Sequence, residues 1–127
     1  FSGDKQLRIL QIIQKKQFRG AEVFASQLSS HLQNSGHEVK IISIYDGNAR
    51  LPFDGEITSL NRAKFSRIFD PYGWGKLSAI IKSFKPNIVQ ANASDTLKYA
   101  VMSKILFKWN VPLVYRNAST PSFYIKN

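Results

Sequence analysis

The sequence predicts an α/β fold: a Rossmann-like, doubly wound and mainly parallel sheet with helices on both faces. Short runs rich in isoleucine, leucine and valine recur along the chain, and such runs are typical of strands buried on both faces of a sheet. The segments between them carry apolar residues three and four positions apart, which is the period of a helix. The chain has 127 residues, of which 43% are hydrophobic, enough for one continuous core. We therefore expect residues 1–127 to form a single domain.

The first predicted unit is a strand, a helix and a second strand. "LRILQII" at residues 7–13 is the first strand, and "EVKIISIY" at residues 38–45 is the second. The helix between them ends at Gly36, a residue type that commonly terminates helices. Its apolar stripe consists of Ala21, Phe24, Ala25, Leu28 and Leu32. A right-handed crossover then makes the two strands parallel.

The same alternation continues to the end of the chain. Further strands are predicted at residues 56–60, 87–91 and 112–116. A helix is predicted at residues 74–85, before Pro86, and another runs to about residue 108. Ser94 or Asp95 is expected to cap this last helix, and Lys104 and Lys108 to complement the negative end of its dipole. If residues 56–60 are the third strand, the strand order is 3-2-1-4-5.

The net charge of the chain indicates which class of partner it binds. Eighteen Lys and Arg residues against eight Asp and Glu give a net charge of +10, which favours anionic partners. The basic residues are dispersed and no nucleic-acid motif is present, so nucleic acid is not the expected partner, while peripheral contact with an anionic membrane is possible. A solvated basic surface explains each single lysine equally well.

The cysteine and histidine content and the hydropathy of the chain argue against disulfides, a metal site and a membrane span. The chain has no cysteine, and His31 and His37 lie far from any second ligand in the sequence, so we expect no disulfide and no metal site. Both histidines are expected to be exposed. No apolar run reaches the ~18 residues of a membrane span, and the N-terminus lacks the apolar core of a signal peptide. A cytoplasmic protein is expected, and the absence of an initial methionine favours a fragment of a longer one.

The predicted strand order locates the candidate site. In such a sheet, ligands bind beyond the carboxyl ends of the strands, where the winding reverses between the first strand and the strand at 87–91. The loops at that point are "QKKQFRG" at 14–20 and "NASD" at 92–95, with "RNAST" at 116–120 beside them. These loops should carry the functional residues.

The first loop suits a phosphate. The amides of Gly20, Ala21 and Glu22 would present partial positive charge at a helix N-terminus, and Lys15, Lys16 and Arg19 would deepen that potential. The alternative is a plain connection with solvated cations. With a single glycine, the loop is not a dinucleotide-binding fingerprint, and no Walker motif occurs.

The other loops contribute polar candidates. Asn92 and Ser94 are candidates for substrate binding, and Asp95 is either a general base or a helix cap. Arg116 and Asn117 end a strand at the same edge, where an arginine is also commonly part of a surface ion pair. The two "NAS" sequences, at 92 and 117, match the glycosylation pattern but are expected to be coincidental.

Three stretches together resemble a known family. "RILQII…RGAEVFASQLSSHLQNSGHEVKIIS", "FKPNIVQANASD" and "VPLVYRN" look like the N-terminal half of a GT-B glycosyltransferase of family 4. The Gly-Ala-Glu at 20–22 that opens a helix, the Gly-His-Glu-Val at 36–39 and the Lys-Pro-Asn-Ile-Val at 85–89 are its most specific parts. The resemblance covers nearly the whole chain.

The resemblance implies a retaining transferase of two Rossmann-like halves. This chain would be the half that receives a sugar or lipid acceptor, while an absent C-terminal half would grip a nucleotide-sugar, which is a substrate and not a cofactor. Family members usually have two glycines in the first loop, and Arg19 stands at the first of those places. The family's histidines are also missing, with Gln90, Asn92, Asn117 and Ala118 in those regions. Arginine, asparagine and backbone amides would then stabilise the leaving phosphate.

Two other classes stay open. A stand-alone flavodoxin-like domain that binds phosphate or a nucleotide would have a similar length and periodicity. A basic nucleic-acid-binding module would explain the charge, although the aromatic residues follow the period of a core.

Overall fold

The computed structural model describes residues 6–15, 20–45, 47, 50–53, 55, 57–60, 70–117 and 120–125. They form a six-stranded sheet with the order β3-β2-β1-β4-β5-β6. The first five strands are mutually parallel, which confirms the predicted fold class and the order 3-2-1-4-5. These strands are β1 (Arg8–Lys15), β2 (Glu38–Tyr45), β3 (Ile57–Ser59), β4 (Ile88–Ala91) and β5 (Leu113–Asn117).

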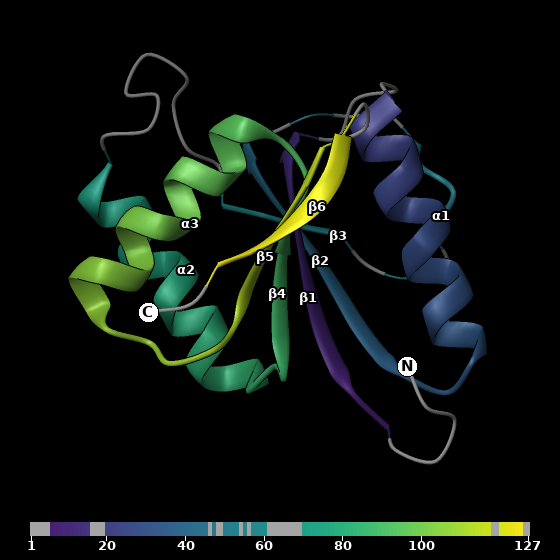
Figure 1. The fold of residues 1–127 in the computed structure, drawn as a ribbon, viewed down its shortest axis with the longest axis horizontal. Helices are drawn as coiled ribbons and strands as arrows, with labels where there is room; N and C mark the ends of the chain where they lie inside the picture. Colours follow the sequence, from purple (N-terminus) through teal and green to yellow (C-terminus); the bar gives the residue numbers. More distant parts are fainter. Residues whose placement is uncertain are drawn as a thin grey trace.

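Helices cover the sheet on both faces. Helix α1 (Gly20–Asn34) lies on one face, and α2 (Pro71–Phe84) and α3 (Ser94–Phe107) lie together on the other (Figure 1). Leu10 and Ile12 of β1 belong to the cluster that packs with α2 and α3, whereas Ile9 and Ile13 belong to the smaller clusters that pack with α1. Successive residues of β1 therefore serve opposite faces, as a strand buried on both sides requires.

The main core lies on the α2–α3 side. It joins β1, β2, β4 and β5 to the buried faces of α2 and α3, and its largest side chains include Trp74, Tyr99 and Trp109. Tyr99 is fully buried, and its hydroxyl donates to Asp70, 3.1 Å away, whose other carboxylate oxygen accepts from the Gly73 amide. Asp70 thus caps α2, with Pro71 as the first helical residue, so the helix begins three residues before the predicted start.

The face under α1 is partly polar, contrary to the predicted stripe. Phe24 is exposed, and the side chains that α1 buries include Glu22, Ser26 and Ser29 besides Ala25 and Leu32. Alternation along the strands places Gln11 of β1 and Ser43 of β2 beneath the helix. Small polar residues of α1 thus lie over a sheet face that is itself partly polar, which a count of apolar residues does not reveal.

The helix ends follow the backbone chemistry of their terminal residues. Gly36 has φ +100, and the His37 amide bonds to the Leu32 carbonyl, which closes α1 where the sequence predicts. Lys85 and Lys108 end α2 and α3 in the left-handed conformation, each donating its amide to a carbonyl four residues earlier. Lys104 lies in the last turn of α3, as predicted, but it is buried, and its Nζ donates to carbonyls of the α3–β5 connection.

The sixth strand was not predicted. Strand β6 (Thr120–Ile125) runs antiparallel to β5, with Asn117 opposite Thr120 and Leu113 opposite Ile125. It stands at the sheet edge, where Pro121 costs no ladder hydrogen bond that a central strand would need.

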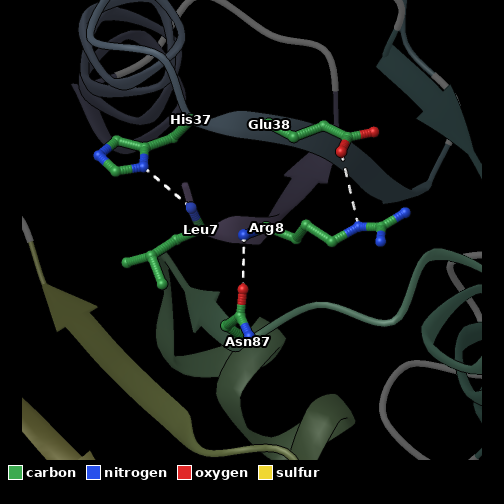
Figure 2. A network of polar contacts seen from close by, with 5 residues as sticks. All are labelled: Leu7, Arg8, His37, Glu38 and Asn87. Carbon is green, nitrogen blue, oxygen red and sulfur yellow. Dashed lines mark hydrogen bonds and ion pairs between the residues drawn. The ribbon is translucent and has the colours of Figure 1, made fainter. Parts of the chain in front are cut away.

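A polar network fastens the amino ends of the central strands (Figure 2). The Leu7 amide donates to Nδ1 of His37 at 3.1 Å, and the Arg8 amide donates to Oδ1 of Asn87 at 2.8 Å. Arg8 also pairs with Glu38, at 3.5 Å between Nε and Oε1. His37 is therefore buried and accepts a backbone hydrogen bond, which corrects its expected exposure, while His31 is exposed as predicted.

Candidate functional site at the carboxyl edge

The winding of the sheet reverses between β1 and β4, as predicted. These two strands pair in parallel, with Ile12 opposite Ala91, so the segments that follow them leave the sheet side by side. Helix α1 begins after β1 on one face and α3 begins after β4 on the other (Figure 1). The carboxyl edge between the two helix starts is where a doubly wound sheet binds its ligands.

Asn92 is the best-fixed side chain at this edge. It is buried, and its Nδ2 donates to Oε1 of Gln11 at 2.9 Å and to the carbonyl of Ile12 at 3.1 Å. Its Oδ1 accepts from Nε2 of Gln90 at 3.2 Å, and its backbone amide bonds to the same Ile12 carbonyl. Asn92 therefore holds the end of β4 against β1 and is a positioning residue, because its side-chain amide is spent on the protein itself. Its burial also fits the expectation that the "NAS" at 92 is no glycosylation site.

Gln11, the partner of Asn92 in this network, has a side-chain donor that is not used. Gln11 is fully buried, and its Nε2 has no hydrogen-bond partner within the described chain. A buried donor without an acceptor costs free energy, and a water or a ligand atom usually supplies the missing partner. The sequence offers no signal for this role, because Gln11 lies in the middle of an apolar strand.

Asp95 lies in the first turn of α3 and does not cap it. The N-cap position is Ala93, whose amide donates to Oγ1 of Thr96 at 2.9 Å, so both Ser94 and Asp95 are already helical. Ser94 is exposed, whereas Asp95 is half-buried and its Oδ2 lies 3.4 Å from Nε2 of Gln14, the next-to-last residue of β1. The structure thus connects the first and second predicted loops through a carboxylate and an amide.

The start of α1 presents open space. Gly20 is exposed, and a methyl group added there would contact nothing within 4 Å. Glu22, in contrast, is buried in the first turn, where a carboxylate interacts favourably with the helix dipole. Only its backbone amide is a candidate for anion binding, as it is for Ala21, because a buried carboxylate would repel a phosphate.

The basic residues of the first loop are only partly described. Lys15 ends β1 and is half-buried, while Lys16 and Arg19 lie outside the described residues. Arg116 and Asn117 close β5 next to β4, and Asn117 pairs with Thr120 across the turn into β6. The turn residue Ala118 is not among the described residues. The predicted positions that the structure describes at strand ends therefore meet at one edge.

The described residues contain no group of three or more His, Asp or Glu side chains that could hold a metal ion. In the same part of the chain, no helix is long and apolar enough to cross a membrane. A cavity of about 390 Å³ does occur, but it is lined by Arg8, Lys40, Thr58, Ile80 and Phe84, among others, and so lies at the amino edge. It is separate from the candidate site.

Comparisons with known proteins point to one family. The family model described as Glycosyltransferase Family 4 matches residues 18–120, which include both helix starts of the site. Comparison with curated proteins finds no match. Among solved structures, a deacetylase triple mutant involved in teicoplanin biosynthesis is similar, with a TM-score of 0.51 and 14% identity over 87% of this chain. The similarity spans 63% of that deacetylase chain, and at this identity it supports the fold alone.

Proposed function

Because the chain belongs to glycosyltransferase family 4, we propose that it is the acceptor-side half of a retaining GT-B enzyme that transfers a sugar from a nucleotide-sugar. The acceptor hydroxyl forms a bond to the sugar's anomeric carbon, and the bond from that carbon to the nucleotide phosphate breaks. A second half of the protein grips the donor, and the cleft between the halves opens onto the carboxyl edge of this sheet.

The observation that supports this proposal is the pairing of two helix starts across the β1–β4 boundary. Gly20, the first residue of α1, has open space around the position of an added Cβ, so the backbone there suits the approach of a phosphate oxygen, and Lys15 adds positive charge at the end of β1. Negative charge that develops on the leaving phosphate is stabilised most by donors that are already in place. The hydrogen bond between Asn92 and Gln11 holds the end of β4 against β1 and so helps to keep this edge of the sheet rigid.

Asp95 supplies the acceptor side of this site. Its carboxylate is half-buried and is oriented by Gln14, which leaves lone pairs for a substrate hydroxyl. A hydrogen bond from the acceptor to Asp95 aligns the attacking oxygen, and the carboxylate is placed to take the hydroxyl proton as the new bond forms.

Charge reversal at Lys15 tests the proposal in the full-length protein. Lys40 is a matched control, because it is also a half-buried lysine on a strand but lines the cavity at the amino edge. Lys15→Glu should lower kcat/KM for nucleotide-sugar turnover about tenfold or more, since a carboxylate would repel the donor phosphates. Lys40→Glu should change it less than about twofold. Equal losses in both variants would show that only net charge matters and would refute this placement of the site.

A further inference from the structure

Within the described chain, the buried side-chain atoms that lack a hydrogen-bond partner all lie between α1 and the sheet. These atoms are Nε2 of Gln11, Oγ of Ser29 and Oγ of Ser43, and all three residues are fully buried. Ser29 belongs to α1, while Gln11 and Ser43 lie on β1 and β2, on the face that α1 covers. Each such atom costs free energy, so three of them in one layer indicate a common cause.

Gln11 and Ser29 both stand at the boundary between two apolar clusters. One cluster under α1 includes Ile13 of β1 and Ala25 of α1, and the other includes Ile9 of β1 and Leu32 of α1. Along β1, Gln11 is the residue of this face that separates the two clusters. Along α1, Ser29 lies four residues after the first cluster and three before the second. The carboxamide and the hydroxyl therefore occupy the same level of the layer, from opposite sides.

The carboxamide of Gln11 is oriented by its oxygen. Oε1 accepts from Nδ2 of Asn92 at 2.9 Å, and the same Nδ2 donates to the Ile12 carbonyl at 3.1 Å. This arrangement makes Oε1 the acceptor end of the amide and leaves Nε2 as a donor in need of an acceptor. Gln11 and Ser29 do not bond to each other. A small polar molecule between them is what would satisfy both.

We propose that Gln11 and Ser29 bind an ordered water molecule between α1 and the sheet. The water accepts from Nε2 of Gln11 and shares a hydrogen bond with the Ser29 hydroxyl. A third bond to Ser43, directly or through a second water, completes the roughly three bonds that buried waters make. Gln90, opposite Gln11 on β4, is half-buried, so solvent reaches the side of this layer. The inference concerns the packing of α1 and does not depend on the proposed transfer reaction.

A crystal structure of the full-length protein tests the proposal directly. An ordered water should lie about 2.7–3.2 Å from both Nε2 of Gln11 and Oγ of Ser29. The Ser29→Ala variant should lose this water. Ser26→Ala should keep it, because the Ser26 hydroxyl already donates to the Glu22 carbonyl at 2.8 Å. A direct hydrogen bond between Gln11 and Ser29, or another protein group in the place of the water, overturns the proposal.

Hydrogen exchange in the full-length protein gives an independent test in solution. Ser29→Ala should accelerate exchange at the amides of α1, residues 20–34, about fivefold, because a bridge between the helix and the sheet is lost. Ser26→Ala is the matched control, since it removes a buried hydroxyl that bonds only within the same helix, and it should change the rates less than about twofold. If the Ser29 hydroxyl had no partner, its removal would leave exchange unchanged or slow it, and the proposal would be wrong.

Gln11→Met removes the second partner of the water. It also removes the acceptor of Asn92, but this loss is the same with and without Ser29→Ala and cancels in the comparison. Ser29→Ala should therefore accelerate exchange in α1 less in the Gln11→Met background than in the wild type. An equal acceleration in both backgrounds would mean that no water joins the two residues.

Discussion

Two glycines in the first turns of helices have opposite surroundings. A Cβ at Gly73 would overlap the Tyr99 hydroxyl and come within 2.5 Å of Oδ2 of Asp70, while a Cβ at Gly20 would meet nothing. Gly73→Ala should therefore destabilise the protein by about 1–3 kcal/mol, as overpacking does, whereas Gly20→Ala should leave the free energy of unfolding unchanged or slightly raised. Urea denaturation of both variants gives the comparison.

The hydroxyl itself provides the control for Gly73. In the double variant Gly73→Ala, Tyr99→Phe, the hydroxyl oxygen that clashes with the new Cβ is gone. Tyr99→Phe should therefore lower the free energy of unfolding less in the Gly73→Ala background than in the wild type, where it removes the hydrogen bond to Asp70. Additive losses would contradict the clash. If Gly20→Ala also weakens donor use without loss of stability, the backbone there approaches a substrate.

Helix α3 is held at its C-terminal end by one buried lysine. Nζ of Lys104 donates to the carbonyls of Trp109 and Val111, at 3.2 and 2.6 Å, and lies 4.6 Å from the centroid of the Trp109 ring. Lys104→Met would leave two carbonyls without a donor and should cost about 1–3 kcal/mol. Lys98→Met, on the exposed side of the same helix, should cost far less in the same unfolding measurement.

The buried position of Lys104 also gives a pH dependence of known sign. Desolvation lowers the pKa of Lys104 below its ordinary 10.5. Between the lowered pKa of the folded state and 10.5, the unfolded chain binds more protons, so the contribution of Lys104 to stability rises with pH through that window. The gap in unfolding free energy between wild type and Lys104→Met should accordingly widen as the pH approaches 10.5. A gap that narrows over this range would rule out desolvation as the dominant effect.

At the scale of the whole molecule, one six-stranded sheet joins the helices that lie on its two faces. The isolated 127 residues should therefore unfold cooperatively on heating, with coincident transitions by circular dichroism and fluorescence. Under the proposed two-half arrangement they should not transfer sugar, because only one wall of the cleft is present. Donor turnover by this isolated chain would refute the two-half mechanism without touching the fold.

The sequence predicted the arrangement of elements better than the orientation of side chains. Period and turn residues located all five parallel strands: four are largely apolar runs, and β3, with the sequence Ile-Thr-Ser, follows a turn-rich segment. They missed β6, whose Pro121 and polar residues give no such run. They also placed Phe24 inside and gave no sign that Ser29 is buried, since the polar residues Gln11 and Ser43 are seen to lie under α1 only once β1 and β2 are paired.

The sequence also predicted some residues of the candidate site and missed others. Strand ends identified Asn92 and Asp95, because the carboxyl edge follows from the strand order alone. The partners Gln11 and Gln14 could not be found, since the contacts Gln11–Asn92 and Gln14–Asp95 each join residues 81 positions apart. Such contacts depend on the register of β1 against β4, which no local pattern specifies.

The polar residues under α1 leave this helix with less apolar contact to the sheet than the α2–α3 layer has. Buried atoms of Gln11, Ser29 and Ser43 lack hydrogen-bond partners within the described residues. The apolar side chains under α1 form two small clusters and not one large one. A helix of 15 residues is about 22 Å long, so α1 reaches from the carboxyl edge to the Leu7–His37 contact near its other end. We therefore expect hydrogen exchange to be faster at the amides of α1 than at those of α2 and α3.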